Sequence, residues 1–214
     1  MKKVLALVLF LALMMSAAAG TACAETLDFE AGTPSKVSPE EFQLYFSVLE
    51  EDSGFNFVWD DSVKTDGIYS VYSGTSEDGM MTVKIYAVND GVVYAEGDGD
   101  LVIDFSDAES ATQFGEWFGA SLGGMIFSFQ IGDHGPESLD EETVGRYSDE
   151  LMAMINEVTD NMNDYEKMTN GFANRAVVLD YPTGLETRGS ISGSIFSITL
   201  HILVSSADGK LTIR

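Results

Sequence analysis

The chain has 214 residues, 45% of them hydrophobic, and its 35 acidic and 11 basic side chains give a formal net charge of −24. This length suits a single domain with a core of its own. Nucleic-acid binding needs Lys and Arg gathered on one face, and an anionic membrane surface would repel the chain, so we exclude nucleic acid as a partner and leave cations, basic peptides and neutral ligands open. The charge also keeps such a protein dispersed in solution.

Residues 1–24 have the pattern of an export signal. Lys2 and Lys3 form a positive start, residues 4–15 are an uninterrupted apolar run, and the segment ends in Ala22-Cys23-Ala24, the small-residue pattern that precedes cleavage. The apolar run is shorter than the roughly 20 residues that a bilayer span needs. We therefore expect a removable signal peptide, cleaved after Ala24, and no membrane span in the mature chain.

Cys23 leaves one alternative, because bacterial lipoproteins carry a lipid on a Cys that follows the apolar segment. The preceding residues here are Gly20-Thr21-Ala22, and the usual large aliphatic residue three positions before the Cys is missing. A cleavage site therefore remains the preferred interpretation. Cys23 is the only cysteine, so the exported protein would be held by packing without disulfides.

Residues 25–37 form a polar, loosely ordered lead in this interpretation, and a helix follows. Ser38 can cap its free amides, Pro39 suits the first helical position, and Glu41 completes a capping box. Gly54 would end the helix. Its buried stripe comprises Phe42, Tyr45, Phe46 and Leu49.

Residues 67–105 are predicted to form an antiparallel meander. Apolar and polar side chains alternate in this stretch, and Asn89-Asp90-Gly91 and Asp98-Gly99 offer the positive-φ residues of tight hairpins. A shorter strand with the same alternation is expected at residues 55–59. We expect one face to contact the helices through Met81, Val83, Ile85 and Ala87, and the other face to be the place for a partner, with Thr82, Lys84 and Tyr86.

A second helix is predicted from Ser106, where Glu109 completes another capping box. Residues 117–131 contain no charge, but this run is too short for a membrane span, so a buried core helix is expected. Glycines recur on it at every fourth position and would let another element pack closely: Gly115, Gly119 and Gly123.

The rest of the chain predicts one more helix and a second set of strands. Ser138 and Glu141 suggest a third capping box, and the helix should end near Asp160. Strands are expected at residues 175–181, stopped by Pro182, and at 194–205, and a turn at Asp208-Gly209 leads to a last strand ending at Arg214.

Together these elements predict a single α+β domain over residues 38–214. Strands with one apolar face need a cover, so we expect an antiparallel meander sheet of about seven to nine strands with three helices packed on one face.

One catalytic pattern is present, Gly119-Ala120-Ser121-Leu122-Gly123, which matches the G-x-S-x-G of serine hydrolases. Asp180 and His201 follow Ser121 in the order of a catalytic triad. The hydrolase elbow must follow a buried strand, however, and here the preceding residues predict a helix. We therefore favour a small residue on a packed helix over a nucleophile.

The acidic residues around Asp98-Gly99-Asp100, with Asp104, Asp107 and Glu109, suggest calcium. They fail as an EF-hand, because Val102 and Ile103 occupy positions that need an oxygen ligand and a glycine. Solvated hairpin ends explain them better. His134 and His201 are too few for a structural zinc site, and no cofactor motif is present.

These observations favour an exported, non-catalytic binding or interaction module of the bacterial cell envelope or extracellular space, with an unknown protein or small molecule as ligand. The first alternative is a small secreted serine hydrolase that uses Ser121, Asp180 and His201. The second alternative is an acidic calcium-binding protein. We predict no cofactor.

Overall fold

The computed structural model describes residues 24–52, 56–104 and 106–214. The predicted signal peptide up to Cys23 and the predicted helix end at Gly54 lie outside the described residues. The elements in chain order are β1 (Leu27–Glu30), α2 (Pro39–Asp52), β2 (Phe57–Trp59), β3 (Lys64–Asp66), β4 (Tyr69–Ser76), β5 (Met81–Val88), β6 (Gly91–Asp104), α3 (Ala108–His134), a 3-10 turn (Pro136–Ser138), α4 (Glu141–Met162), α5 (Tyr165–Asn170), β7 (Phe172–Val178), β8 (Tyr181–Ser192), β9 (Ile195–Ser205) and β10 (Lys210–Ile213).

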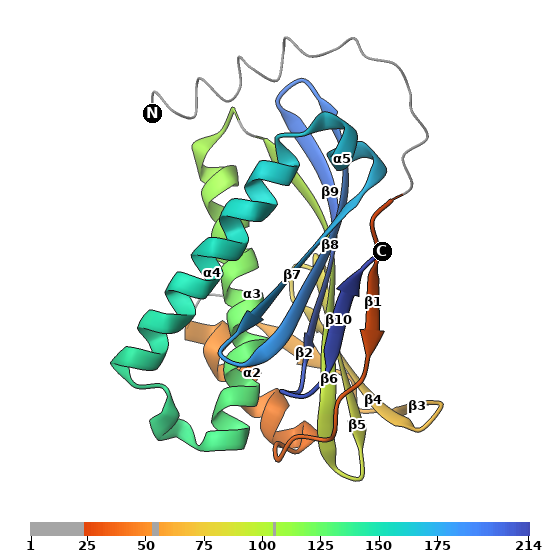
Figure 1. The fold of residues 1–214 in the computed structure, drawn as a ribbon, viewed down its shortest axis with the longest axis vertical. Helices are drawn as coiled ribbons and strands as arrows, with labels where there is room; N and C mark the ends of the chain where they lie inside the picture. The colour runs from red at the N-terminus through yellow and green to blue at the C-terminus, as the bar shows by residue number, and fades with distance from the viewer. Residues whose placement is uncertain (1–23, 53–55, 105) are drawn as a thin grey trace.

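An antiparallel sheet of eight strands is the centre of the molecule (Figure 1). Its order is β2-β4-β5-β6-β9-β8-β7, with the short β3 paired to β4. Two meanders, β4-β5-β6 and β7-β8-β9, are joined where β6 pairs with β9 from Tyr94↔Ser205 to Asp104↔Ile195. The predicted α+β class, with seven to nine antiparallel strands, is confirmed.

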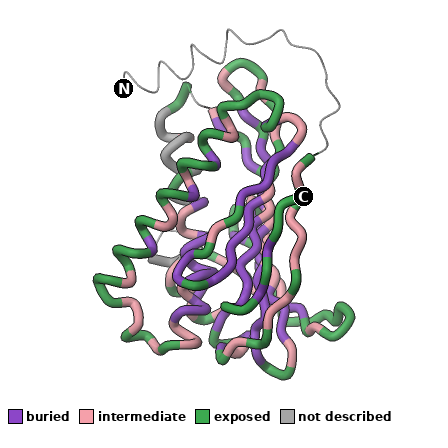
Figure 2. The backbone as a smooth tube through the Cα atoms, viewed as in Figure 1, coloured by how far each residue is buried: buried purple, intermediate pink, exposed green. Residues whose placement is uncertain are grey.

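The three long helices cover one face of this sheet, as predicted. α3 packs on β6 and β9, α4 packs on β7, and α2 packs chiefly on α3. Figure 2 shows the resulting layer of buried residues between helices and strands. Phe129 of α3 is at its centre, with its ring 5.2 Å from that of Phe42 and 5.4 Å from that of Tyr181. Met81, Val83 and Ile85 belong to this core, which confirms the predicted inward face of β5.

Helix starts were predicted with mixed success. The Ser38 capping box is confirmed, because the Glu41 amide donates to Ser38 Oγ and the Ser38 amide donates to the Glu41 carboxylate. The predicted box at Ser138 is wrong: Ser138 closes the 3-10 turn, and Asp140 caps α4 by accepting from the Thr143 amide. The Glu109 side chain, and with it the box predicted at Ser106, lies outside the described part.

α3 is continuous from Ala108 to His134. A Cβ atom at Gly123 would lie 2.7 Å from the Tyr147 hydroxyl, so this glycine makes room for a side chain of α4. The predicted close packing holds at this glycine, whereas a Cβ atom at Gly115 or Gly119 would meet nothing within 4 Å. None of the helices in the described ranges is long and apolar enough to cross a membrane.

The lead before the first helix is not loosely ordered. Its residues 27–30 form β1, which pairs with β10 as a two-stranded ribbon, from Leu27↔Ile213 to Glu30↔Lys210. The ribbon lies on the sheet face opposite the helices and covers part of it, because Leu27, Phe29 and Leu211 turn inward. An apolar residue at every second position of this short segment is the signal that the polar composition obscured.

β6 is longer than predicted, and this correction matters most for function. Asp98-Gly99 is not a hairpin turn: both residues lie inside a 14-residue strand that pairs with β5 and β9. The real β5–β6 turn is the other predicted one, where Asn89 and Asp90 have φ values of 50° and 65°. Asp98 and Asp100 therefore belong to a sheet face.

Pro182 does not stop a strand. β7 ends at Val178, the turn residues Leu179 and Asp180 have positive φ, and Pro182 is the second residue of β8. The pairing of β8 with β9 begins only at Thr183↔Val204, so the missing amide hydrogen of Pro182 costs no bond to β9. The expected strand at 175–181 is therefore the β7–β8 hairpin.

Candidate functional site

The sheet face opposite the helices, called the open face below, carries rows of side chains across β5, β6, β9 and β8. Residues directly opposite one another on antiparallel strands point to the same side, which brings residues distant in sequence together. From the covered end to the exposed end the rows are Tyr86–Tyr94, Lys84–Glu96–Leu203, Thr82–Asp98–His201–Glu186, Asp100–Thr199–Arg188 and Val102–Ser197–Ser190.

The ribbon covers only the first end of these rows. Tyr86 and Tyr94 are buried, with their rings stacked 4.2 Å apart, and Phe29 of β1 contacts Tyr94 edge-on at 4.8 Å. Asp98 and His201 are half-buried, and Arg188 is exposed. The open face thus grades from an apolar base under the ribbon to a polar surface. Thr82, Lys84 and Tyr86 lie on the face opposite the helices, as predicted, but the ribbon covers Tyr86.

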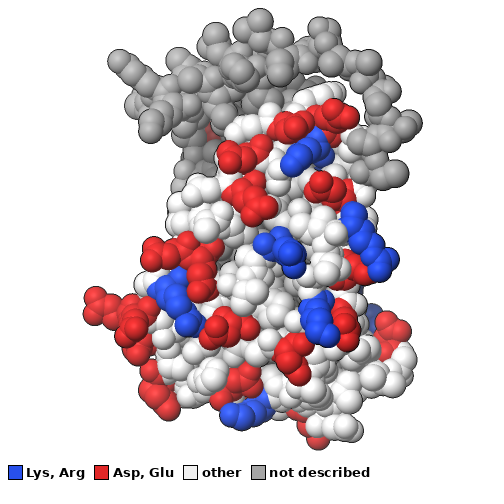
Figure 3. Space-filling view, viewed as in Figure 1, with Lys and Arg blue, Asp and Glu red and all other residues white. Residues whose placement is uncertain are grey.

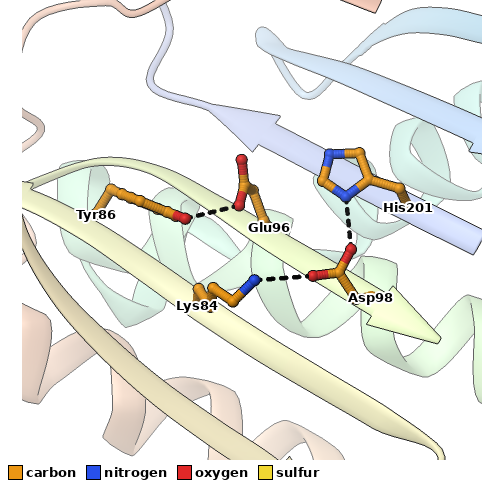
Figure 4. A network of polar contacts seen from close by, with 5 residues as sticks. All are labelled: Lys84, Tyr86, Glu96, Asp98 and His201. Atoms are coloured by element: carbon orange, nitrogen blue, oxygen red, sulfur yellow. Dashed lines mark hydrogen bonds and ion pairs between the residues drawn. The ribbon is translucent and has the colours of Figure 1, made fainter. Parts of the chain in front are cut away.

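A polar network occupies the middle of the open face and is defined by Lys84, Tyr86, Glu96, Asp98 and His201 (Figure 4). The Asp98 carboxylate contacts His201 Nδ1 at 2.8 Å and accepts from Lys84 Nζ at 3.1 Å. The Tyr86 hydroxyl donates to Glu96 at 2.9 Å. Three neighbouring strands contribute to the network, so the register of the sheet fixes its geometry.

These contacts shift the ionisation of both members of the central pair. The hydrogen bond from His201 is the main reason that the pKa of Asp98 is lowered to about 2, against the opposing effect of burial, and Lys84 adds to the lowering. The same bond raises the pKa of His201 above 6.5, again against burial, with smaller contributions from the negative charges of Glu96 and Glu186. Asp98 is therefore an anion at neutral pH, and its negative charge stabilises the imidazolium form of His201 relative to the neutral imidazole.

A shallow groove of about 390 Å³ adjoins the network at its exposed end. Thr199 Oγ1 donates to the Asp100 carboxylate at 2.8 Å on one side. Arg188 is exposed on the other side, and within residues 24–52, 56–104 and 106–214 no hydrogen bond or ion pair occupies its guanidinium. Val102, whose exposed fraction is 71%, supplies an apolar contact. The side chains that line the groove on the open face are Asp100, Val102, Arg188, Ser190, Ser197 and Thr199.

The groove and the network together can bind a polar ligand by hydrogen bonds. Arg188 offers up to five donors, the Asp100 carboxylate accepts, and the hydroxyls do both. A groove of this volume falls in the range of small-molecule sites, although its open shape would leave much of a ligand exposed.

The residues of the predicted triad are not brought together. Ser121 is buried on α3, on the helix side of the sheet, with an exposed fraction of 1%. His201 is on the open face and pairs with Asp98. Asp180 is in the β7–β8 turn, 3.2 Å from Arg146. No general base therefore reaches Ser121 among these residues.

The acidic residues considered for calcium are also spread out. Asp98, Asp100 and Asp104 lie along the extended β6, and the Asp104 carboxylate accepts from Ser106. His134 is exposed at the end of α3. In the part of the chain that the structure describes, no three His, Cys, Asp or Glu side chains are grouped so that they could hold a metal ion.

Comparisons with protein-family models, with curated proteins and with solved structures found no match.

Sequence reasoning missed the residues that matter most here. Asp98 and Asp100 were assigned to a turn, and Glu96 and Arg188 were not singled out. One signal could have found the first group: acidic residues alternate with small or apolar ones from Glu96 to Leu101, which continues the period of the strand. No local signal connects Arg188 to Asp100, because only the pairing of β8, β9 and β6 places them in one row.

Proposed function

We propose that the chain is an exported, non-catalytic binding module of the bacterial cell envelope or the extracellular space, and that its ligand binds on the open face. The observation that carries the proposal is the polar network at the edge of an exposed, hydroxyl-lined groove. Binding sites commonly pair a few fixed polar groups with an accessible hollow, and this face has both. The export pattern in residues 1–24 supports the location.

A partly buried network of charges lowers the stability of the fold unless opposite charges and hydrogen bonds compensate for the lost contact with water. A sheet face without a cover does not need such a network for its stability. Lys84 and Asp98 are 36% and 45% exposed, so solvent already screens their ion pair and its contribution to stability is small. Its fixed arrangement suits recognition better than stabilisation. The ligand expected there is polar and forms hydrogen bonds with Asp100, Arg188 and Thr199.

The test is a thermal-shift screen of the purified chain from Glu25 onward. The panel contains monosaccharides, amino acids, short basic and neutral peptides, and calcium at constant ionic strength, since a ligand that binds only the folded state raises the melting temperature. We expect at least one polar organic compound to raise it, and the rise to be lost in the double variant Arg188→Ala/Thr199→Ala.

Met152→Ala serves as the matched control, because Met152 is exposed on α4, away from the open face. The control should keep the full ligand-induced rise. The proposal fails if no compound stabilises the protein, or if the double variant is stabilised as much as the wild type. A rise with calcium alone would favour the acidic calcium-binding alternative.

A further inference from the structure

β7 is the last strand of the sheet, and part of its outer edge is unpaired. Among the strands of the described residues it pairs only with β8, and Val178↔Tyr181 closes their two-residue turn. Such a closing pair exchanges both backbone hydrogen bonds, and bonded pairs then alternate along the hairpin. The backbone groups of Ala173, Arg175 and Val177 therefore point away from β8.

Carboxylates occupy both ends of this edge but not its middle. The Ala173 amide donates to Glu25 at 3.4 Å, and the Leu179 amide donates to Glu150 at 2.5 Å. Within the described ranges, the outward amides of Arg175 and Val177 donate to no backbone or side-chain acceptor. The stretch left between these two carboxylates covers residues 174–178, about 17 Å of extended chain.

The usual protections of an edge strand are weak in this stretch. β7 contains no proline, and within the described ranges no further strand is hydrogen-bonded to its outer edge, although α4 and β10 lie beside it. Val177 is 61% exposed, and the Arg175 guanidinium is turned aside to the Leu211 carbonyl of β10 at 3.1 Å. In Figure 1, β7 runs along the front of the molecule, between α4 on the left and β10 on the right. Between these two elements, the exposed side chains of Arg175 and Val177 mark the part of β7 that solvent reaches.

On the side of α4 the charge beside this edge is negative, whereas Arg175 of β7 itself is an exposed basic residue. α4 carries several exposed acidic residues, and its one arginine, Arg146, is paired with Glu150 and Asp180. Figure 3, in the same view, shows acidic side chains gathered over α4. The chain as a whole has a net charge of −24. The acidic residues of α4 and the net charge of the chain favour a basic partner and repel an acidic one.

We propose that the free edge of β7 binds an extended, basic segment of a partner protein, which pairs with the Arg175 and Val177 backbone as an added strand. The paired stretch would be about five residues long, since Glu25 and Glu150 limit it at each end. Basic side chains at the ends of that segment would lie near these two carboxylates. This surface is separate from the groove of the open face, so either site can exist without the other.

The first experiment uses an eight-residue peptide of alternating valine and lysine, blocked at both termini, as the probe. Titrated into isotope-labelled protein, it should shift the amide resonances of Arg175 and Val177 and slow their hydrogen exchange. Two control peptides define the mode of binding. The first alternates valine and glutamate and so reverses the charge. The second is the lysine peptide N-methylated at two adjacent central residues, which removes one backbone N–H donor from each edge of the peptide strand. Both should bind at least about tenfold more weakly.

Variants of Val177 test the same contact from the protein side. Val177→Pro removes an outward amide without touching the β7–β8 ladder, and edge strands tolerate proline at such positions. It should weaken binding of the lysine peptide about tenfold, whereas Val177→Thr, which keeps the amide and the branched side chain, should bind within about twofold of the wild type. Thermal melts show whether each variant is folded.

Two results would overturn the proposal. One is equal binding of the N-methylated peptide, which would mean adsorption to the acidic surface without strand pairing. The other is a set of resonance shifts confined to the open face around Asp98 and Thr199, which would assign the peptide to the groove and leave the edge without a role. If Val177→Pro does not fold, the N-methylated peptide alone decides between the outcomes.

Discussion

The two faces of β6 show how one strand serves two purposes. Toward the helices it presents Leu101 and Ile103, both buried in the core. On the opposite side it presents Asp98 and Asp100, which bond to His201 and Thr199 of the neighbouring β9. Because side chains alternate along a strand, the core can be fixed by one set of residues while the other set is free to carry polar groups.

The difference between the faces comes from their covers. Three long helices bury the first face along its length, whereas the β1–β10 ribbon buries only the aromatic end of the second. A sheet face that is neither covered nor apolar contributes little to stability, so substitutions on the two faces should separate stability from binding.

The helix face should be the most sensitive. Phe129→Ala removes a fully buried ring that contacts Phe42 and Tyr181, and we expect a loss of about 3–5 kcal/mol in the free energy of unfolding. Urea denaturation measures it. Val102→Ala on the open face is the control, and it should change the free energy by less than about 0.5 kcal/mol, since Val102 is 71% exposed. Similar losses in both variants would contradict the division between the faces.

The ribbon should rank second. Phe29→Ala removes the half-buried ring that packs edge-on against Tyr94. Because the fold removes much of the apolar surface of this ring from water, we expect a loss of about 2 kcal/mol in the free energy of unfolding. Equilibrium unfolding by urea gives the value, with Thr212→Ala on the exposed side of β10 as control. An unchanged stability of Phe29→Ala would show that the ribbon adds nothing to the open face.

The polar network should contribute less than the ribbon. Tyr86→Phe keeps the stacked ring and removes only the hydroxyl that donates to Glu96 at 2.9 Å. We expect a loss of about 1 kcal/mol, the usual net value of one hydrogen bond. Tyr165→Phe, at a half-exposed position on α5, should leave the stability unchanged when both variants are unfolded in parallel. A loss above that of Phe29→Ala would mean that the network is a structural core of its own.

The smallest effect is expected at the Asp98–His201 pair, and it should depend on pH. Asp98→Asn should cost less than about 1 kcal/mol, because the Asp98 side chain is 45% exposed. His201 has a raised pKa in the folded state. Its contribution to the free energy of unfolding is therefore fully present below pH 6.5 and is lost as the pH rises through that raised pKa. Asp98 has a lowered pKa in the folded state. Its contribution to the free energy of unfolding is therefore present above pH 3.8, the ordinary pKa of an aspartate, and is lost as the pH falls toward about 2.

The difference in unfolding free energy between wild type and Asp98→Asn should therefore be larger at about pH 5.5 than at about pH 8.5. Urea denaturation at the two pH values gives this difference. A histidine titration by NMR adds a second readout: the pKa of His201 should fall in Asp98→Asn. A His201 pKa at or below 6.5 in the wild type would refute the charged pair.

Much of the fold follows from local patterns in the sequence. The Ser38 capping box, the alternation from Met81 to Ile85 and the Asn89-Asp90 turn each depend on a few neighbouring residues, and the structure confirms all three. The strand end predicted at Pro182 is wrong. A proline interrupts a strand only where its missing amide hydrogen would have bonded to a neighbouring strand, and at Pro182 the pairing with β9 has not yet begun. β1 was missed for a related reason: its partner β10 is at the other end of the chain.

The candidate site was less predictable than the fold. His201 and Asp98 are 103 residues apart in sequence and meet only because β6 and β9 pair in one register. An Asp-Gly dipeptide such as Asp98-Gly99 is typical of a turn when taken alone, and the pairing on both sides of β6 overrides it. The triad order groups His201 with Ser121, but Ser121 is on the other side of the sheet.

Mapping a bound ligand onto the two faces by NMR tests directly whether ligands bind to the open face. The compound that most stabilises the wild type in the thermal screen is titrated into labelled protein, and amide shifts are followed residue by residue. We predict that the largest shifts fall on the exposed rows of the open face, at Asp98, Asp100, Arg188, Thr199 and His201. Shifts confined to α2, α3 and α4, with these five residues unchanged, would contradict the assignment of binding to the open face.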